Sequence, residues 1–167
     1  MKRLLVLATV TLLLTACSLF NKKPKDDYAG IDGSDYVSGI PLGERAEGAS
    51  FLGGNVSRNQ FDPVQFGFDS YVVSSSEMYK VRAVADAMRS TGNTVIIAGF
   101  TDERGTEEYN RGLGEKRALA VREALSQAGI RANRIQTVSF GKEMPVDPAS
   151  NETAWAKNRR AEFGIVK

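Results

Sequence analysis

Two segments of helical length enclose a short run of β-branched residues, and this order restricts the fold class. The run, residues 94–98, predicts a buried strand that is covered by helices. Before it, Ser74 to Ser76 offer N-caps, apolar residues recur at helical spacing, and Gly92 marks the end of a helix. After it, Thr106 is expected to cap a second helix that ends at Gly129.

The remaining apolar runs complete a two-layer arrangement. Residues 64–68, 135–140 and 160–166 each predict a strand. Residues 151–157 predict a short helical turn. The resulting order, β-α-β-α-β-β, predicts an α+β two-layer sandwich with the helices on one face of a mixed sheet.

The second helix carries residues that bear on its packing. Its first turns contain Gly112 and Gly114, which either weaken the helix by about 1 kcal/mol each relative to alanine or admit a close neighbour. The side chains expected to face the core share a helical spacing and are Tyr109, Leu113, Ala120, Val121, Ala124, Leu125 and Ala128.

The N-terminus has the organisation of an export signal. Two basic residues precede an apolar block, residues 4–14, which is about half of the roughly 20 residues needed to span a bilayer. Leu-Thr-Ala before Cys17 resembles the lipobox of bacterial lipoproteins, so we expect a signal peptide over residues 1–16 and lipidation of Cys17. An ordinary secretory signal is the alternative. Ser18 in place of aspartate favours the outer membrane, by resemblance to lipoprotein sorting patterns.

Removal of the signal peptide changes the charge balance. The full chain has 22 basic and 20 acidic side chains, and loss of Lys2 and Arg3 leaves 20 of each. A net charge of zero gives no support to nucleic-acid binding by general attraction. The chain has no histidine, and its single cysteine is Cys17.

Residues 17–59 are predicted to form the lipidated N-terminus and a flexible tether. Gly, Ser, Asp and Lys are frequent there, and apolar residues are scattered without a helical or strand period. Residues 51–54 are the least coil-like part, and whether they pack onto the domain edge is left open. The folded domain is predicted to cover residues 60–167.

The side chains in the sequence that are best suited to bind a ligand are an acid and a base on neighbouring elements. The stretch from Gly99 to Thr106 places Asp102 just after a predicted strand, and Arg117 follows on the next helix. A guanidinium matches a carboxylate, and a carboxylate accepts hydrogen bonds from an ammonium group. We expect both side chains to be exposed, and an exposed acid and an exposed base on neighbouring elements suit a zwitterionic ligand.

These motifs resemble those of the OmpA-like domain family. The resemblance rests on Phe66-Gly67-Phe68-Asp69, on the Asp102 and Arg117 motifs and on Asn158-Arg159-Arg160, and it covers residues 60–167. It implies an OmpA-like sandwich, in the lipoprotein form of the family, that binds the peptide stem of peptidoglycan non-covalently through diaminopimelate. By motif position, Asp102 would accept from the ligand ammonium group, and Arg117 would hold a ligand carboxylate. Further residues would line the same pocket: Phe68, Asp69, Tyr71, Thr101 and Leu113.

Each proposed site residue also has a plain structural interpretation. Asp102 can cap the turn before the helix, and Arg117 can pair with a neighbouring glutamate. Phe68 can belong to the core, and Asp69 and Tyr71 can simply form the turn.

Three further positions are singled out by the motifs. Arg159 and Arg160 are expected to divide their roles, so that one contacts the ligand or orders the Asp102 loop and the other is a structural pair partner. Phe100 stands where many members of the family carry histidine. We therefore expect binding without a histidine-dependent step between about pH 6 and pH 8.

Three functions are considered. The first is a binding module that needs no cofactor: an outer-membrane lipoprotein that links the membrane to peptidoglycan and, by resemblance, has a TolB-like partner in a Tol-Pal system that supports envelope integrity and cell division. The second is a peptidoglycan-processing enzyme, which without histidine would depend on carboxylates such as Asp69 and Asp102. The third is a structural lipoprotein whose site is unused. The motifs favour the binding module.

Overall fold

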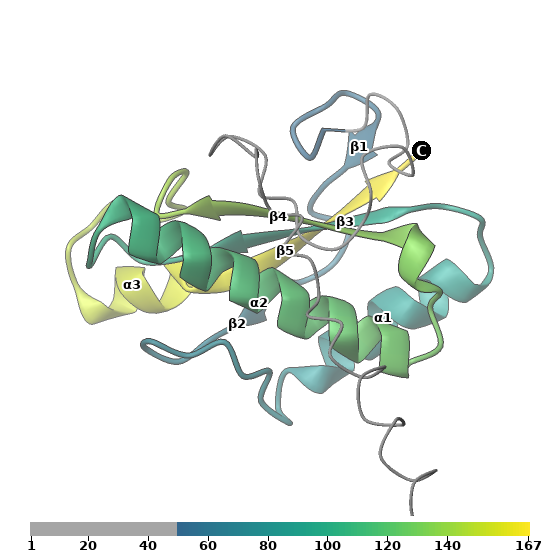
Figure 1. Ribbon diagram of the computed structural model, residues 1–167, viewed down its shortest axis with the longest axis horizontal. Helices are drawn as coiled ribbons and strands as arrows, with labels where there is room; N and C mark the ends of the chain where they lie inside the picture. The colour runs from purple at the N-terminus through teal and green to yellow at the C-terminus, as the bar shows by residue number, and fades with distance from the viewer. Residues whose placement is uncertain (1–49) are drawn as a thin grey trace, which may run out of the picture. The chain divides into compact units, whose positions relative to one another are not determined.

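The computed structural model describes residues 50–167. The predicted signal peptide, Cys17 and the tether up to residue 49 lie outside the described residues. Figure 1 shows the helices and strands, which in chain order are β1 (Val56–Ser57), β2 (Val64–Gln65), α1 (Met78–Arg89), β3 (Val95–Phe100), α2 (Glu107–Gln127), η2 (Ala132–Arg134), β4 (Ile135–Gly141), α3 (Glu152–Asn158) and β5 (Arg160–Val166). In the described part of the chain, no helix has the length and apolar character needed to cross a membrane.

The strands form one mixed sheet in the order β1-β5-β3-β4, and β2 also pairs with β5. Strand β3 pairs parallel with β4 and antiparallel with β5. All the residues of β3 are buried, as expected of a central strand. The predicted α+β mixed sheet is therefore confirmed.

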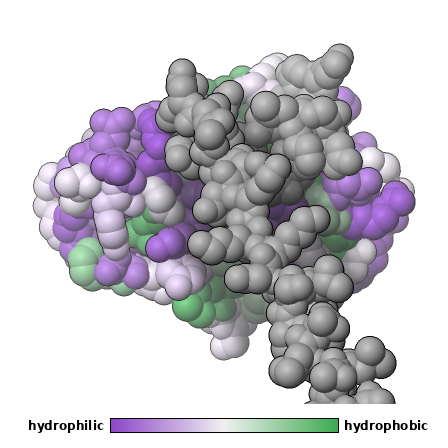
Figure 2. Space-filling model, in the orientation of Figure 1, coloured by the Kyte–Doolittle hydropathy of each residue, from purple (hydrophilic) through white to green (hydrophobic). Residues whose placement is uncertain are grey.

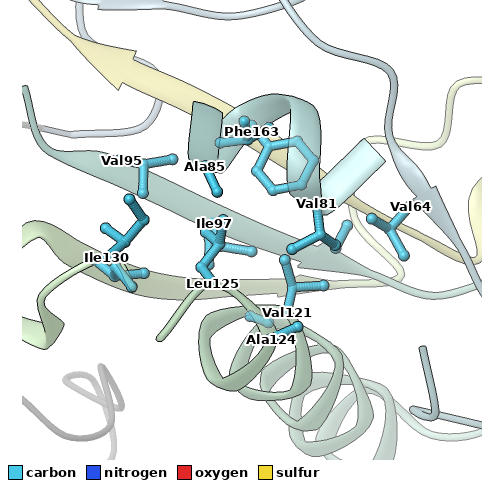
Figure 3. Packing of buried hydrophobic residues seen from close by; sticks show 14 of the residues in the cluster. Val64, Val81, Ala85, Val95, Ile97, Val121, Ala124, Leu125, Ile130 and Phe163 are labelled. Atoms are coloured by element: carbon cyan, nitrogen blue, oxygen red, sulfur yellow. The ribbon is translucent and has the colours of Figure 1, made fainter. Parts of the chain in front are cut away.

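Helices α1 and α2 cover one face of this sheet, as Figure 1 shows. Figure 3 shows how Val121 and Leu125 of α2 come together with Ile97 of β3 and Val81 of α1. Their burial removes apolar area from water, which contributes about 25 cal/mol per Å². The main core therefore lies between the two helices and the sheet.

A smaller core on the opposite face corrects the predicted domain boundary. Phe51 is only 3% exposed, and its ring packs against Phe100 and Phe140, with centroids 6.4 and 5.8 Å away. Val56 in β1 pairs with Val166 at the end of β5. Phe51, in the stretch left open by the sequence, therefore packs onto the sheet, and the tether predicted to continue to residue 59 is wrong for Val56 and Ser57, which form β1.

The entry to α1 also differs from the prediction. The predicted serine caps are absent: Glu77 is the N-cap residue, and no side chain caps the helix. The Glu77 carboxylate instead accepts hydrogen bonds from the backbone N–H of Gln65, at 2.7 Å, and from Lys80 Nζ, at 2.8 Å. The strand predicted over residues 64–68 ends at Gln65, and the chain turns at Asp69, whose φ of 50° lies in the left-handed region.

The caps of α2 and α3 are made by their own side chains. Thr106 Oγ1 accepts from the backbone N–H of Tyr109 at 3.2 Å, which confirms the predicted cap of α2. Asn151 caps α3 in the same way, through the N–H of Ala154 at 3.0 Å. Tyr109 itself was expected to face the core, but it is 53% exposed.

Two glycines bring α2 unusually close to the strands that it covers. A Cβ on Gly99 of β3 would lie 1.9 Å from the carbonyl oxygen of Gly114, and a Cβ on Gly114 would lie 2.4 Å from Ser139 Oγ in β4. A Cβ on Gly112 would meet nothing within 4 Å. Gly114 therefore admits a close neighbour, and Gly112 does not.

Candidate ligand-binding site

A pocket of about 250 Å³ opens where the loop after β3 meets the first turns of α2 and the loop after β2. Its lining comes from all three segments: Phe68, Asp69, Thr101, Asp102, Arg104, Gly105, Tyr109, Asn110, Leu113 and Arg117. The structure thus brings together all but one of the residues that the family resemblance places in a pocket. The exception is Tyr71, which lines an adjoining groove along α2.

Asp102 lies at the base of this pocket and is held by arginines. It is 5% exposed, and its Oδ1 accepts from the backbone N–H and the Nε of Arg104, at 3.1 and 3.2 Å. Its Oδ2 accepts from Arg104 Nη2 at 2.7 Å and from Arg159 Nη1 at 3.4 Å. Burial alone would raise the pKa of the Asp102 carboxyl, but the Arg104 hydrogen bonds and charge, with help from Arg159, hold this pKa below 3.8.

Arg117 reaches the pocket from α2 and is fully buried, with an exposed fraction of 0%. It donates to three backbone carbonyls: Nε to Ser70 at 2.8 Å, Nη1 to Phe100 at 2.8 Å and Nη2 to Gly67 at 3.3 Å. Burial lowers the pKa of its guanidinium to about 10, and the charge of Asp102 opposes this shift. Arg117 is therefore still a cation at neutral pH, and it joins the loop after β2 to the end of β3.

The expectation of an exposed acid and an exposed base is wrong. Both Asp102 and Arg117 are buried, because each satisfies its charge with partners from the protein itself. Arg117 also does not depend on the neighbouring glutamates suggested by the sequence, since backbone carbonyls receive its hydrogen bonds. A ligand reaches both groups only through the pocket that they line.

The loop after β2 supplies an outer wall. Phe68 is 64% exposed and lines the pocket, so it is a wall residue and not part of the core. Asp69 Oδ1 accepts a hydrogen bond from the hydroxyl of Tyr109, and this bond raises the pKa of Tyr109. The loop is therefore joined to the first turn of α2 at the mouth of the pocket.

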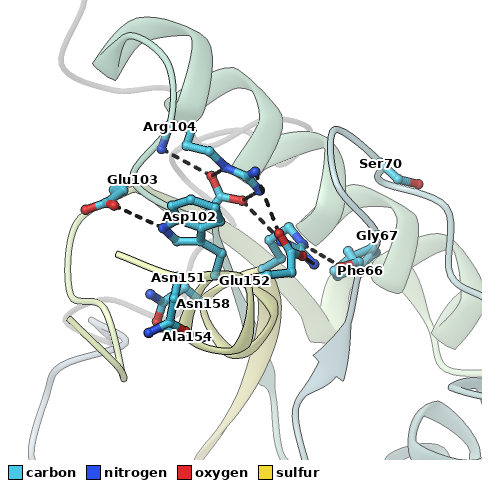
Figure 4. Close-up of polar contacts among 12 residues, drawn as sticks. Phe66, Gly67, Ser70, Asp102, Glu103, Arg104, Asn151, Glu152, Ala154 and Asn158 are labelled. Atoms are coloured by element: carbon cyan, nitrogen blue, oxygen red, sulfur yellow. Dashed lines mark hydrogen bonds and ion pairs between the residues drawn. The ribbon is translucent and has the colours of Figure 1, made fainter. Parts of the chain in front are cut away.

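Arg104 is the charged lining residue of the pocket that the sequence did not predict. Its guanidinium lies between two rings, with its Cζ 4.2 Å from the Phe68 centroid and 4.1 Å from the Trp155 centroid. Figure 4 shows this guanidinium against the Asp102 carboxylate. Its place two residues after Asp102 was the one available signal, but the two rings come from segments distant in the chain.

Arg159 orders the loop that carries Asp102, as one of the two expected roles requires. Besides Asp102, it donates to the Phe66 carbonyl at 3.1 Å and to Glu152 Oε1 at 2.8 Å. It therefore links α3, the loop after β2 and the loop after β3. Arg159 is absent from the lining of the pocket.

Comparison with known proteins assigns the chain to a family. The model of the OmpA family matches residues 65–159. The chain belongs to the OmpA family. It is 40% identical over 121 residues to a peptidoglycan-associated lipoprotein of Pasteurella multocida, a match that covers 71% of this chain and 81% of the relative. A peptidoglycan-associated lipoprotein of Haemophilus influenzae is 35% identical over 161 residues, covering 96% of this chain and 94% of the relative.

A solved structure supports the same assignment to the OmpA family. The crystal structure of the peptidoglycan-associated lipoprotein from Burkholderia pseudomallei superposes with a TM-score of 0.60 at 44% identity. The match covers 62% of this chain and 88% of that structure. The predicted OmpA-like sandwich is thereby confirmed.

Phe100, the departure from the pattern expected of the OmpA family, faces away from the pocket. Its ring is buried on the opposite face of the sheet, where it stacks on Phe140 at 5.2 Å and lies 3.9 Å from the Arg160 guanidinium. Arg160 also donates to Glu162 Oε1 at 2.5 Å. Arg160 therefore has the structural role, and Phe100 lines none of the pocket that holds Asp102.

Two observations bear on what this OmpA-family domain can bind. Within residues 50–167, no group of His, Cys, Asp and Glu side chains is arranged to hold a metal ion. In the same region, Thr101 Oγ1 is a buried pocket atom without a hydrogen-bond partner. Buried hydroxyl groups are normally hydrogen-bonded, so this oxygen suits a polar group of a ligand.

Proposed function

We propose that this OmpA-family chain binds the peptide stem of peptidoglycan non-covalently, with an ammonium and carboxylate end of diaminopimelate in the pocket. The observation that carries the proposal is that a buried carboxylate and a buried guanidinium, Asp102 and Arg117, line one pocket. Asp102 accepts from the ligand ammonium group, and Arg117 donates to the ligand carboxylate.

The lining adds polar selectivity to this charge pair. Thr101 Oγ1 lacks a partner among the described residues, so a ligand group that reaches it gains a hydrogen bond without displacing one. The Phe68 ring and Leu113 form apolar walls that suit the methylene chain between the two ends of a diamino acid.

The relatives and the N-terminal sequence support a role in the cell envelope. The relatives from Pasteurella and Haemophilus are both named peptidoglycan-associated lipoprotein. In our proposal Cys17 carries the lipid, the outer membrane holds the chain at its periplasmic face, and the domain grips the cell wall. A TolB-like periplasmic protein is the further partner, in a Tol-Pal system that supports envelope integrity and cell division.

The site is less suited to the alternative of a peptidoglycan-processing enzyme. A glycosidase needs a carboxylic acid that is protonated near neutral pH, which requires a raised pKa. The pKa of Asp102 is instead lowered by Arg104 and Arg159, against the effect of burial. Incubation with purified sacculi is therefore expected to release no soluble muropeptides.

Co-sedimentation with purified sacculi tests the proposed function. Full-length protein in detergent is incubated with sacculi, and the bound fraction is compared with that of Asp102→Asn, which removes the charge and keeps the size. Loss of one member of a desolvated charge pair costs roughly 2–5 kcal/mol of binding, so Asp102→Asn is expected to remain in the supernatant.

The matched control changes the same side chain at an exposed position. Asp86 lies on α1, where its carboxylate pairs with Arg89 one turn further along the helix, outside the pocket. Asp86→Asn is expected to sediment like the wild type. Equal retention of Asp102→Asn, with its fold verified by circular dichroism, would rule out the proposed site.

A further inference from the structure

The acid of the pocket is already paired with a cation of the protein. Arg104 Nη2 lies 2.7 Å from Asp102 Oδ2, and Arg104 Nε lies 3.2 Å from Oδ1. These are the oxygens that an incoming ammonium group needs. A ligand cation must therefore compete with the Arg104 guanidinium for the same carboxylate.

Arg104 can leave Asp102 more easily than the other cations of this region. Arg117 is bound to three backbone carbonyls, and the Arg159 side chain is buried between Phe66 and Glu152. The Arg104 side chain is 32% exposed, and its other ion pair among residues 50–167 is a long one, 3.7 Å from Nη1 to Glu152 Oε2. Displacement therefore costs it the contacts with Asp102 but few others.

The two aromatic rings keep a displaced guanidinium at the pocket. The Arg104 Cζ lies over both rings, 4.2 Å from the Phe68 centroid and 4.1 Å from the Trp155 centroid. A guanidinium can slide between such rings and still keep its cation–π contacts. Phe68 also lines the pocket, so the displaced group stays next to the ligand.

The charges that line the pocket are balanced before any ligand enters. Asp69 and Asp102 are the acidic lining residues, and Arg104 and Arg117 are the basic ones. A ligand that brings only an ammonium group adds an uncompensated positive charge to a confined site. A ligand that brings an ammonium and a carboxylate group keeps the balance.

We propose that Arg104 is an internal competitor for Asp102 and thereby determines ligand specificity. The ligand ammonium replaces the Arg104 guanidinium at Asp102, and the released guanidinium donates to a carboxylate of the same ligand. This inference rests on the proposed function and adds a residue that selects for the zwitterion. Amines that lack a carboxylate are rejected because they leave Arg104 without an anion.

Two small probes of matched shape test this inference. Diaminopimelate has an ammonium and a carboxylate group at each end, and cadaverine is the same five-carbon diamine without the carboxylates. Their affinities for full-length protein in detergent are measured by isothermal titration calorimetry. The wild type is expected to bind diaminopimelate at least about 100-fold more tightly than cadaverine, since each 1.4 kcal/mol is a factor of ten.

Three variants separate the role of Arg104 from a general loss of charge. In Arg104→Gln, cadaverine is expected to bind about tenfold more tightly than in the wild type, while diaminopimelate binds no more tightly. In Arg104→Lys, which keeps a competing cation, cadaverine stays weak. Arg111→Gln removes an exposed arginine of α2 that pairs with Glu107 and Glu143 outside the pocket, and both affinities stay at wild-type values.

A spectroscopic measurement reports on the movement itself. Trp155 is the single tryptophan of the chain, and its ring stacks on Arg104. Diaminopimelate is expected to change Trp155 fluorescence in the wild type and to leave it nearly unchanged in Arg104→Gln. A purely structural Arg104 would give neither the fluorescence difference nor a gain of cadaverine affinity.

The outcomes distinguish this inference from the proposed function. If the wild type binds diaminopimelate but Arg104→Gln keeps the wild-type ratio of the two affinities, or loses both affinities equally, the role of Arg104 is overturned and the proposed function stands. If cadaverine affinity rises as much in Arg104→Lys as in Arg104→Gln, competition by charge is also overturned. If the wild type binds neither diaminopimelate nor sacculi, both the proposed function and the role of Arg104 are overturned.

Discussion

The two charged residues Arg117 and Asp102 of the pocket differ in the groups to which their side chains are hydrogen-bonded. Arg117 satisfies its guanidinium with backbone carbonyls, so it stabilises the fold whether or not a ligand is present. Asp102 depends on side chains, above all on Arg104, which a ligand can replace. Arg117 is thus part of the folded framework, and Asp102 is the residue of this pair whose contacts a ligand can replace.

Removal of Arg117 is expected to destabilise the domain. Arg117→Ala leaves the carbonyls of Gly67, Ser70 and Phe100 without their donor, and we expect the free energy of unfolding to fall by roughly 2–4 kcal/mol. Urea unfolding followed by circular dichroism measures this change. Arg111→Ala, on the exposed side of α2, is the control and should stay within about 0.5 kcal/mol of the wild type. A loss as small as that of the control would contradict the framework role of Arg117.

The pH dependence of binding follows from the same two residues. The pKa of Asp102 lies below 3.8, so the stability and affinity that its charge contributes are present above about pH 4 and are lost as the pH falls through this lowered value. The pKa of Arg117 is about 10, so its charge is lost only as the pH rises through that value. Sacculus binding is therefore expected to be constant between about pH 5 and pH 9. A step between about pH 6 and pH 8, where histidine would titrate, would be inconsistent with this assignment.

At the scale of elements, close contact between α2 and the sheet sets the position of Asp102 relative to Arg117. Gly99 lies near the end of β3, shortly before Asp102, and Gly114 lies on α2, shortly before Arg117. The backbones of the two glycines touch without an intervening side chain. Any residue larger than glycine at these points would push the helix outward. The pocket would then widen, and the two charged groups would no longer suit one end of a diamino acid.

Two alanine substitutions in the same helix test this positioning. Gly114→Ala places a Cβ 2.4 Å from Ser139 Oγ and 2.9 Å from the Gly99 carbonyl oxygen, so we expect loss of stability and at least about tenfold weaker sacculus binding. Gly112→Ala meets open space and is expected to stabilise the domain by about 0.5–1 kcal/mol with unchanged binding. Thermal unfolding and co-sedimentation measure both effects. If the two variants behaved alike, the close approach at Gly114 would have no role in positioning the site.

The elements differ in how far the sequence could predict them. β3, α2 and the Thr106 cap follow from local pattern, because a buried strand and a long amphipathic helix repeat their signals over many residues. β1 consists of Val56 and Ser57 alone, and its pairing depends on the far end of the chain, so no local period reveals it. The place of Arg104 between Phe68 and Trp155 was unpredictable for the same reason.

At the scale of the whole described domain, Figure 2 shows how polar and apolar residues are distributed on one face. On the face shown in Figure 2, hydrophilic residues cover much of the surface that the grey atoms leave visible, and the apolar patches among them are small. Scattered apolar residues of this kind are normal for a protein surface. The second core, on the opposite face of the sheet from α1 and α2, is closed by the segment that leads into β1.

The extent of the folded domain gives the last prediction. A fragment that begins at Gln60 lacks Phe51 and β1, so it exposes Ile96, Ala98 and Phe100, which these residues cover. Loss of an aromatic side chain from such a core costs roughly 3–5 kcal/mol, and the uncovered β5 edge is free to pair with another chain. The fragment is therefore expected to melt at a lower temperature than one that begins at Ser50, to bind a dye for apolar surfaces and to aggregate. Since the pocket with Asp102 and Arg117 lies on the other side of the sheet, any folded fraction should still bind sacculi. Equal melting temperatures of the two fragments would show that residues 50–59 are not part of the stable domain.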